Sequence, residues 1–237
     1  MNFIELQNVY KVYKNGVTAI TDLSLNIKKG DFVFIIGQTA CGKSTLIKMM
    51  YREERPTKGT VMIGGINVAK LKNSKVYKLR RKIGIVFQDY KLLPKLTAYE
   101  NVAFVLESYG YKESEIKPKV IDALTRVGLK DKLRHFPHEM SGGEQQRVCI
   151  ARAIVNNPKV LICDEPTGNL DATTSKEIME VIDSINKELG TTIIMATHDK
   201  DIVNRMKKRV IALRSGMLMS DTEKGSYKID ETAKNIG

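Results

Sequence analysis

The chain has 237 residues, with 39 lysines and arginines against 27 aspartates and glutamates, a formal net charge of +12. This length can bury the core of one large domain. No stretch approaches the roughly 18 consecutive apolar residues that a membrane-spanning helix needs. The charge predicts an acidic partner, either nucleic acid or an anionic membrane surface, and does not choose between them. The basic runs Lys70 to Lys82 and Arg205 to Arg209 could equally be solvated helix faces.

The N-terminus and the cysteines indicate where the chain works. The first residues, MNFIELQNVYKV, read as a strand and lack the basic start and apolar core of a signal peptide. Cys41, Cys149 and Cys163 are odd in number and widely spaced, so neither a disulfide framework nor a zinc site is indicated. We therefore expect a reducing compartment and a cytoplasmic location.

The predicted elements begin with strands. Alternating apolar and polar residues over Phe3–Val12 and Ala19–Ile27, separated by Lys14-Asn15-Gly16, predict an antiparallel hairpin. Gly59 to Gly65 predicts further short strands. Apolar runs typical of strands buried on both faces of a parallel sheet follow at Phe32–Ile36, Ile83–Phe87, Val160–Cys163, Thr192–Ala196 and Val210–Leu213.

Helical patterns separate these strands. From Thr97 to about Asn156 the spacing is helical, punctuated by Pro118 and Pro137, and Ser175 to Leu189 is a clear amphipathic helix. Strands alternating with helices predict a parallel α/β sheet with a helical insertion. We expect one domain over residues 1–237, with a core at 1–88 and 157–216, a helical subdomain at 89–156 and a C-terminal tail at 217–237 to which we assign no function.

The stretch Gly37 to Ser44, GQTACGKS, fits the phosphate-binding pattern G-x-x-x-x-G-K-[ST], with a strand before it and a helix after it. Gly37 and Gly42 let backbone amides approach an anion closely, and the following helix directs its positive end to the same point. Lys43 would reach the outer phosphates, and the Ser44 hydroxyl would ligate Mg²⁺. A glycine turn before an ordinary helix is the alternative.

Further polar residues follow two other buried strands. VLICDE ends in Asp164, which would hold the metal, and Glu165, which would take a proton from an attacking water. His198 follows the strand TTIIMAT, where its imidazole could bond the γ-phosphate or that water. A lone histidine at a strand end is often only structural.

The segment Met140 to Arg147, MSGGEQQR, resembles the signature motif of the ATP-binding-cassette (ABC) ATPases. The resemblance covers Phe3 to about Gly216 and implies the ABC fold: a P-loop NTPase with a RecA-like parallel core, an N-terminal antiparallel β-subdomain and a helical subdomain. It implies ATP and Mg²⁺ as cofactors. Thr39-Ala40 departs from the family, in which Ser-Gly is frequent.

The same resemblance implies roles for individual residues. Glu165 corresponds to the catalytic glutamate and His198 to the switch histidine; Tyr13 corresponds to the aromatic residue that stacks on adenine. The implied nucleotide-binding set is Tyr13, Gly37, Gln38, Thr39, Ala40, Cys41, Gly42, Lys43, Ser44, Thr45 and Gln88. The implied metal ligands are Ser44, Gln88 and Asp164.

The signature also implies an assembly. Ser141 would cap a helix beginning near Gly142, and in the family this tip faces the ATP held by the other protomer of a head-to-tail dimer. The implied contacts to that ATP are Ser141, Gly142, Gly143 and Glu144, and the implied dimer loop is Asn169, Leu170 and Asp171. We therefore expect a homodimer on ATP binding.

Within the family, Val86–Glu107 and Ile162–Asp171 most resemble the branch that acts in bacterial cell division with an FtsX-like integral membrane protein. This implies a peripheral ATPase on the cytoplasmic face of the cell membrane that activates cell-wall hydrolases. A groove for a short helix of the partner is predicted after Gln88, at Tyr90, Leu92, Leu93, Leu96 and Tyr99, although these residues could instead pack the helical core.

Three alternatives stand beside this reading. The first is an ATPase of lipoprotein release or of macrolide or peptide export, because these proteins share much of the same motif sequence. A nucleic-acid-acting ABC ATPase usually carries coiled-coil or zinc-bearing insertions or tandem cassettes, which this chain lacks, so no nucleic acid is expected. An unrelated phosphate-loop kinase would not need SGGEQ.

Overall fold

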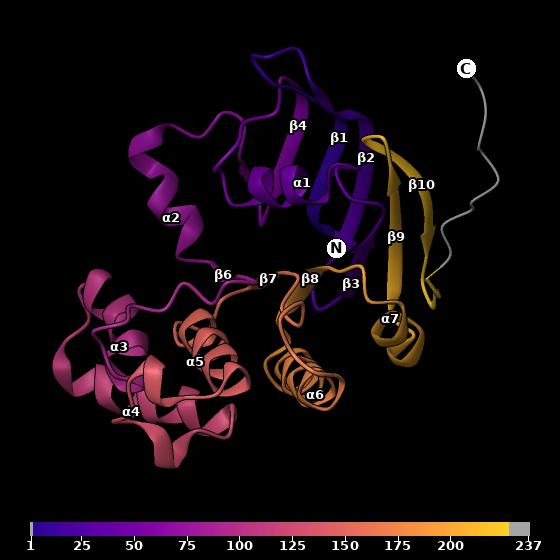
Figure 1. Cartoon of the computed structure of the whole chain (residues 1–237). Coiled ribbons are helices and arrows are strands. Elements are labelled where there is room, and N and C mark those ends of the chain that lie inside the picture. Colours follow the sequence, from indigo (N-terminus) through magenta and orange to yellow (C-terminus); the bar gives the residue numbers. More distant parts are fainter. Residues whose placement is uncertain (1, 228–237) are drawn as a thin grey trace. The chain divides into compact units, whose positions relative to one another are not determined.

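The computed structural model describes residues 2–227, and its contacts divide them into two units (Figure 1). Unit 1 comprises residues 2–28, 32–70 and 196–227, and unit 2 comprises residues 29–31 and 71–195. This division runs across the boundaries expected at residues 88 and 157. The strands that flank the helical region, residues 83–86 and 160–164, pair with each other, and the first of them packs against the helix at residues 142–154.

Unit 1 contains the predicted hairpin. Strands β1 (Asn2–Val12) and β2 (Thr18–Lys28) pair antiparallel, and β4 (Lys58–Ile63) and β5 (Ile66–Asn67) extend the sheet in the order β2-β1-β4-β5. The alternating residues Ile4 and Leu6 are buried, as the period-two pattern predicts.

Unit 1 also holds the strand that leads into the phosphate loop. β3 (Phe32–Ile36) is buried throughout and pairs in parallel with β9 (Arg209–Arg214). Helices α1 (Lys43–Met50) and α7 (Lys200–Met206) belong to the same unit. The start of the expected tail forms a strand, β10 (Met217–Thr222), antiparallel to β9, because a tight turn at Ser215 and Gly216, both with positive φ, reverses the chain. Residues 228–237 lie outside the described range.

Unit 2 contains three predicted strands in the order β8-β7-β6: β6 (Ile83–Val86), β7 (Val160–Asp164) and β8 (Thr192–Ala196). β6 and β7 pair in parallel. The amphipathic helix α6 (Ala172–Leu189) buries Ile178, Ile182 and Ile185. It begins three residues before the predicted start, because Asp171 caps it.

The helical region is also part of unit 2, and its helices α3 (Ala98–Ser108), α4 (Glu113–Arg126) and α5 (Gly142–Ile154) pack on one another (Figure 1). Short helices are α2 (Val76–Arg80), η1 (Asn73–Lys75), η2 (Lys130–Lys132) and η3 (Pro137–Glu139). The expectation that Pro118 interrupts a helix is wrong, because it lies inside α4. The helix continues because its later turns bury Val120 and Leu124.

Two sequence-based expectations can be checked over residues 2–227. No helix in this range combines the length and apolar character needed to cross a membrane. All three cysteines are free thiols and are buried. Burial raises the pKa of the Cys149 and Cys163 thiols, so both remain protonated at neutral pH.

Candidate nucleotide site

The phosphate loop connects β3 to α1 in unit 1, and its two glycines have no room for a side chain. Gly37 has φ 153°, and a Cβ there would lie 2.4 Å from both Cys41 Sγ and Leu213 O. Gly42 has φ 105°, and its Cβ would lie 2.6 Å from Ala19 O. Glycine is therefore required at both positions by backbone angle and by close packing.

The N-terminus of α1 is open to an anion. Gly42 precedes the helix without a side-chain cap, and its first turn contains no acidic residue. By contrast, α3, α5, α6 and α7 begin with side-chain caps from Thr97, Ser141, Asp171 and Asp199. The first amides of α1 and the positive end of its dipole are thus available to a phosphate group.

Lys43 supplies a cation inside this loop. Lys43 is 8% exposed, and its ammonium donates to Gly37 O at 2.8 Å and to Gln38 O at 3.1 Å. An anion in the loop would replace these neutral acceptors with a stronger one. Ser44, the next residue, is exposed and can present its hydroxyl to a cation.

Two further predicted site residues belong to unit 1. Tyr13 follows β1, and its hydroxyl lies 3.1 Å from Thr45 Oγ1, in the helix that starts at the loop. His198 is exposed and follows Thr197, whose amide donates to Ile35 O at 3.2 Å. The backbone just before His198 therefore lies next to the end of β3, which leads into the phosphate loop.

Unit 2 carries the predicted acidic pair at the end of β7. Asp164 and Glu165 are half-buried, and Glu165 has φ 50°, a left-handed conformation that is unusual for a side-chain-bearing residue. The Gly168 amide donates to Glu165 O at 3.1 Å and closes a turn. Such strain at a strand end is typical of functional positions.

The structure brings Gln88 together with the predicted dimer loop. Asn169 Nδ2 donates to Gln88 O at 3.1 Å. A Cβ on Gly168 would lie 2.9 Å from Gln88 Nε2. Glycine at position 168 therefore allows the Gln88 side chain to lie against this loop.

The signature segment caps α5 as predicted. Ser141 Oγ accepts from the Glu144 amide at 3.2 Å, and Glu144 Oε2 accepts from the Ser141 amide at 2.9 Å. This backbone hydrogen bond, helped by Lys132, lowers the pKa of Glu144. Gly143 has a local reason to be glycine, because a Cβ would lie 2.4 Å from Thr174 Cγ2.

Two residues that sequence reasoning missed hold the loop after Gln88. Asn101, fully buried in α3, accepts from the Leu93 amide at 2.8 Å and donates to Leu96 O at 2.8 Å. Arg152, near the end of α5, donates to the carbonyl oxygens of Tyr90 at 2.7 Å and Lys91 at 2.6 Å. The only sequence signal for Asn101 is a polar residue on the buried face of a helix, and Arg152 gives none.

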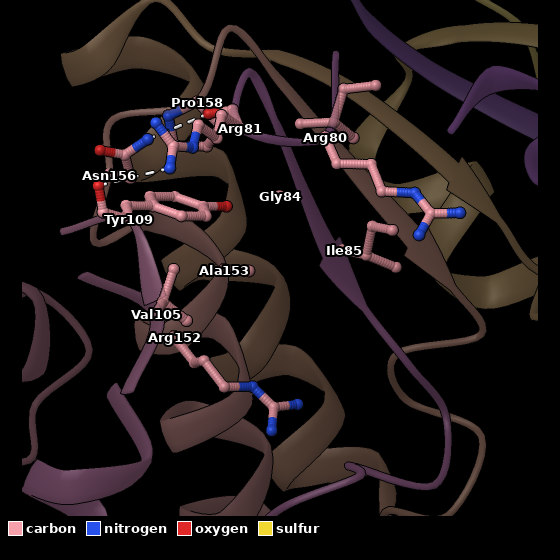
Figure 2. Close-up of a pocket in the computed structure, with 11 residues that line it drawn as sticks. Arg80, Arg81, Gly84, Ile85, Val105, Tyr109, Arg152, Ala153, Asn156 and Pro158 are labelled. Atoms are coloured by element: carbon pink, nitrogen blue, oxygen red, sulfur yellow. Dashed lines mark hydrogen bonds between the residues drawn. The ribbon is translucent and has the colours of Figure 1, made fainter. Parts of the chain in front are cut away.

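Unit 2 also contains a cavity of about 220 Å³ between β6, α3 and α5 (Figure 2). Its apolar floor includes Gly84, where a Cβ would lie 2.3 Å from Ala153 O. Arg81 stacks on the Tyr109 ring at 4.7 Å and donates to Tyr109 O at 3.3 Å. Arg80 and Arg152 also line the cavity.

The five residues expected to form a partner groove, Tyr90, Leu92, Leu93, Leu96 and Tyr99, do not line this cavity. Leu93 is exposed, whereas the other four are half-buried. Asn101 and Arg152 tie the loop that carries these residues to α3 and α5.

Known proteins are similar to this chain over most of its length. The model of the ABC transporter family matches residues 20–168. The chain is 55% identical over 224 residues to a Bacillus subtilis protein named cell division ATP-binding protein FtsE, covering 94% of this chain and 98% of that protein. It is 52% identical over 231 residues to a Streptococcus pneumoniae protein of the same name, covering 98% of this chain and 100% of that protein.

A solved structure is similar as well. A dimeric ATP-binding cassette bound to ADP and Pi has a TM-score of 0.84 and 36% identity, covering 94% of this chain and 100% of that chain. The chain therefore belongs to the ABC transporter family and is an ATP-hydrolysing ABC ATPase. Within that family, it is similar over nearly its whole length to proteins named FtsE.

Proposed function

We propose that this chain is the ATPase subunit of a membrane complex that acts in bacterial cell division. It binds and hydrolyses Mg-ATP in a head-to-tail dimer and drives a conformational change in an FtsX-like membrane partner, which activates cell-wall hydrolases. The observation that carries the proposal is the uncapped start of α1 with the Lys43 ammonium inside the loop. The names of the relatives support the cell-division role.

The triphosphate contacts come from unit 1. The amides of the loop from Gly37 to Thr45 bind the phosphates, and Lys43 neutralises the outer ones. The proposed adenine contact is the Tyr13 ring, which the Thr45 hydroxyl holds beside the start of α1. The side chains of Gln38, Thr39 and Ala40 are exposed, and that of Cys41 is buried.

We assign further residues to the metal and to the reacting water. Ser44, Gln88 and Asp164 offer hydroxyl, amide and carboxylate oxygens, which suit Mg²⁺. Bound Mg²⁺ would offset the charge that develops on the phosphates. Glu165 is the proposed base for the attacking water, and His198 the proposed contact to the γ-phosphate.

The signature closes the site from a second copy. The tip formed by Ser141, Gly142, Gly143 and Glu144 faces the partner's ATP, and Asn169, Leu170 and Asp171 contact the partner subunit. This is a two-fold interface in which ATP is part of the contact. The capping box uses the amides of Ser141 and Glu144, and the Gly142 and Gly143 amides at the positive end of the α5 dipole support this role.

Replacing Lys43 tests the nucleotide site. Lys43→Ala is expected to weaken ATP binding by about 10- to 100-fold, because a charge-assisted hydrogen bond is lost. Equilibrium titration with ATP measures this. Lys48→Ala, which removes a half-buried lysine of the same helix, is the control and should bind ATP normally. Unchanged affinity in Lys43→Ala would contradict the proposal.

We place the membrane partner at the cavity of unit 2 (Figure 2). An apolar floor flanked by Arg80 and Arg152 suits a short amphipathic segment that carries carboxylates. Exposed cations at Lys75, Lys78 and Lys82 increase the positive charge of the same region. The complex would therefore lie at the cytoplasmic face of the cell membrane, where anionic lipids add a second attraction.

Capture from detergent-solubilised membranes tests the partner. The wild-type chain should retain one integral membrane protein, and Arg80→Glu should reduce its recovery. Lys117→Glu reverses an exposed charge in α4, away from the cavity lining, and should not. Recovery of an exporter or lipoprotein-release permease would assign the chain to that process, and capture of nucleic acid alone would contradict a membrane partner.

A further inference from the structure

Tyr13 is held at its backbone and at its hydroxyl. Its amide donates to Val17 O at 2.9 Å, and its carbonyl accepts from the Gly16 amide at 3.0 Å, which closes the turn after β1. The hydroxyl lies 3.1 Å from Thr45 Oγ1. With both ends held, the ring of Tyr13 can still rotate about the axis that joins its backbone to its hydroxyl.

Lys11 restricts this rotation of the Tyr13 ring. Its ammonium lies over the Tyr13 ring, 4.8 Å from the ring centroid. A cation over an aromatic face is attracted by the ring quadrupole, and the attraction is stronger where water is excluded. Lys11 is 8% exposed, although lysines are usually among the most solvated residues.

The ammonium is itself fixed from the opposite side. Lys11 Nζ lies 2.5 Å from Glu54 Oε2 and donates to Arg55 O at 3.0 Å. Glu54 follows α1, and its amide donates to Lys48 O at 3.2 Å. The segment that follows α1 therefore holds the Lys11 ammonium, which in turn lies over the Tyr13 ring.

From this arrangement we infer that Lys11 is a positioning residue for the nucleotide base. It covers one face of Tyr13, fixes the ring plane and leaves the other face for the purine. Glu54 acts indirectly, because its carboxylate holds the Lys11 ammonium in place. A ring fixed before binding loses less conformational entropy when a base stacks on it. The inference rests on the proposed contact between Tyr13 and adenine.

The test compares two ligands that share phosphates and differ in the base. Lys11→Met keeps the length of the side chain and removes the charge. It is expected to raise the Kd and KM for ATP about fivefold to tenfold, with kcat changed less than about twofold. Binding of Mg-tripolyphosphate, which has no base, should not change.

Three variants make the comparison specific. Lys11→Arg keeps a cation and should restore the affinity for ATP. Lys11→Met combined with Glu54→Gln removes the carboxylate left without its lysine, and should show the same selective loss for ATP with a fold as stable as wild type. Lys58→Met removes an exposed charge from β4 of the same sheet and should leave both ligands unaffected.

Two results would overturn the inference. Equal losses for ATP and tripolyphosphate would mean that Lys11 supports the loop as a whole, and no loss for either would mean that it positions nothing. Failure of the proposed function looks different. If Tyr13→Leu binds ATP as tightly as wild type, the base contact itself is wrong, whatever Lys11 does.

Discussion

Ala40 lies at the exposed tip of the phosphate loop with φ 63°, in the left-handed region. For a residue with a Cβ, this conformation costs roughly 1–2 kcal/mol. Glycine would avoid that cost, but it loses about 0.5–1 kcal/mol more in conformational entropy on folding. The departure from the family pattern at this residue therefore has a measurable energetic consequence.

Ala40→Gly is expected to stabilise the folded chain by about 0.5–1 kcal/mol, because the relief of backbone strain exceeds the entropic loss. Denaturant unfolding, compared with wild type at the same pH, measures this. Ala19→Gly, at a residue without positive φ, should destabilise the chain. Destabilisation by Ala40→Gly would show that the surrounding loop supports the strained conformation.

The residues proposed to contact a ligand follow a pattern visible in the sequence, whereas the residues that hold the surrounding loops in place do not. Lys43 and Ser44 belong to a fixed pattern with a strand before it and a helix after it. Asn101 and Arg152 act through backbone carbonyls of a loop that is distant in sequence, so their roles depend on the tertiary fold. Lys11 is similar, because Glu54 is 43 residues away.

At the scale of elements, the starts of several helices depend on carboxylates. Glu100 and Glu144 complete capping boxes at α3 and α5, and Asp171 caps α6. Hydrogen bonds from the Thr97 amide and hydroxyl lower the pKa of Glu100, and hydrogen bonds from the Thr174 hydroxyl and amide lower that of Asp171. A hydrogen bond from the Ser141 amide lowers the pKa of Glu144.

These lowered pKa values predict how the stability of the folded chain depends on pH. When the pKa is lower in the folded state, the unfolded chain binds more protons in acid, so stability falls as pH falls. The contribution is fully present above the ordinary values of 4.5 for Glu100 and Glu144 and 3.8 for Asp171, and is lost below them. Urea midpoints measured from pH 7 to pH 3 should fall for wild type.

The matched variants separate capping from general acid unfolding. Glu100→Gln combined with Glu144→Gln should be less stable at pH 7 and should lose less on acidification than wild type. Glu107→Gln changes an exposed carboxylate in the last turn of α3 and should follow the wild-type curve. Parallel curves for wild type and the double variant would contradict the capping account.

The sequence predicted the existence of most elements better than their ends. The buried residues of β3 form a continuous apolar run and those of α6 recur at helical spacing, and both patterns are visible in one sequence. The start of α6 depends on hydrogen bonds from the Thr173 and Thr174 amides to Asp171. β10 has mostly exposed residues, so its backbone pairing with β9 leaves no apolar pattern to find.

At the scale of the whole molecule, the proposed function assigns roles to residues of each unit. The phosphate loop, Tyr13 and His198 belong to unit 1, whereas Gln88, the signature and the acidic pair after β7 belong to unit 2. The proposed chemistry requires Asp164 and Glu165 to act on a nucleotide bound by unit 1, and the signature to act on that of another copy. Nucleotide binding and dimerisation are therefore predicted to be coupled.

The central claim is that ATP joins two copies of this chain through the signature. Glu165→Gln removes the proposed base, so hydrolysis should slow by about 10²- to 10⁴-fold while ATP binding persists. With Mg-ATP, its molar mass by light scattering after size exclusion should be that of a dimer, and Ser141→Arg in the same background should return it to a monomer. A Glu165→Gln chain that binds ATP and stays monomeric, or a dimer that Ser141→Arg leaves intact, would contradict the account.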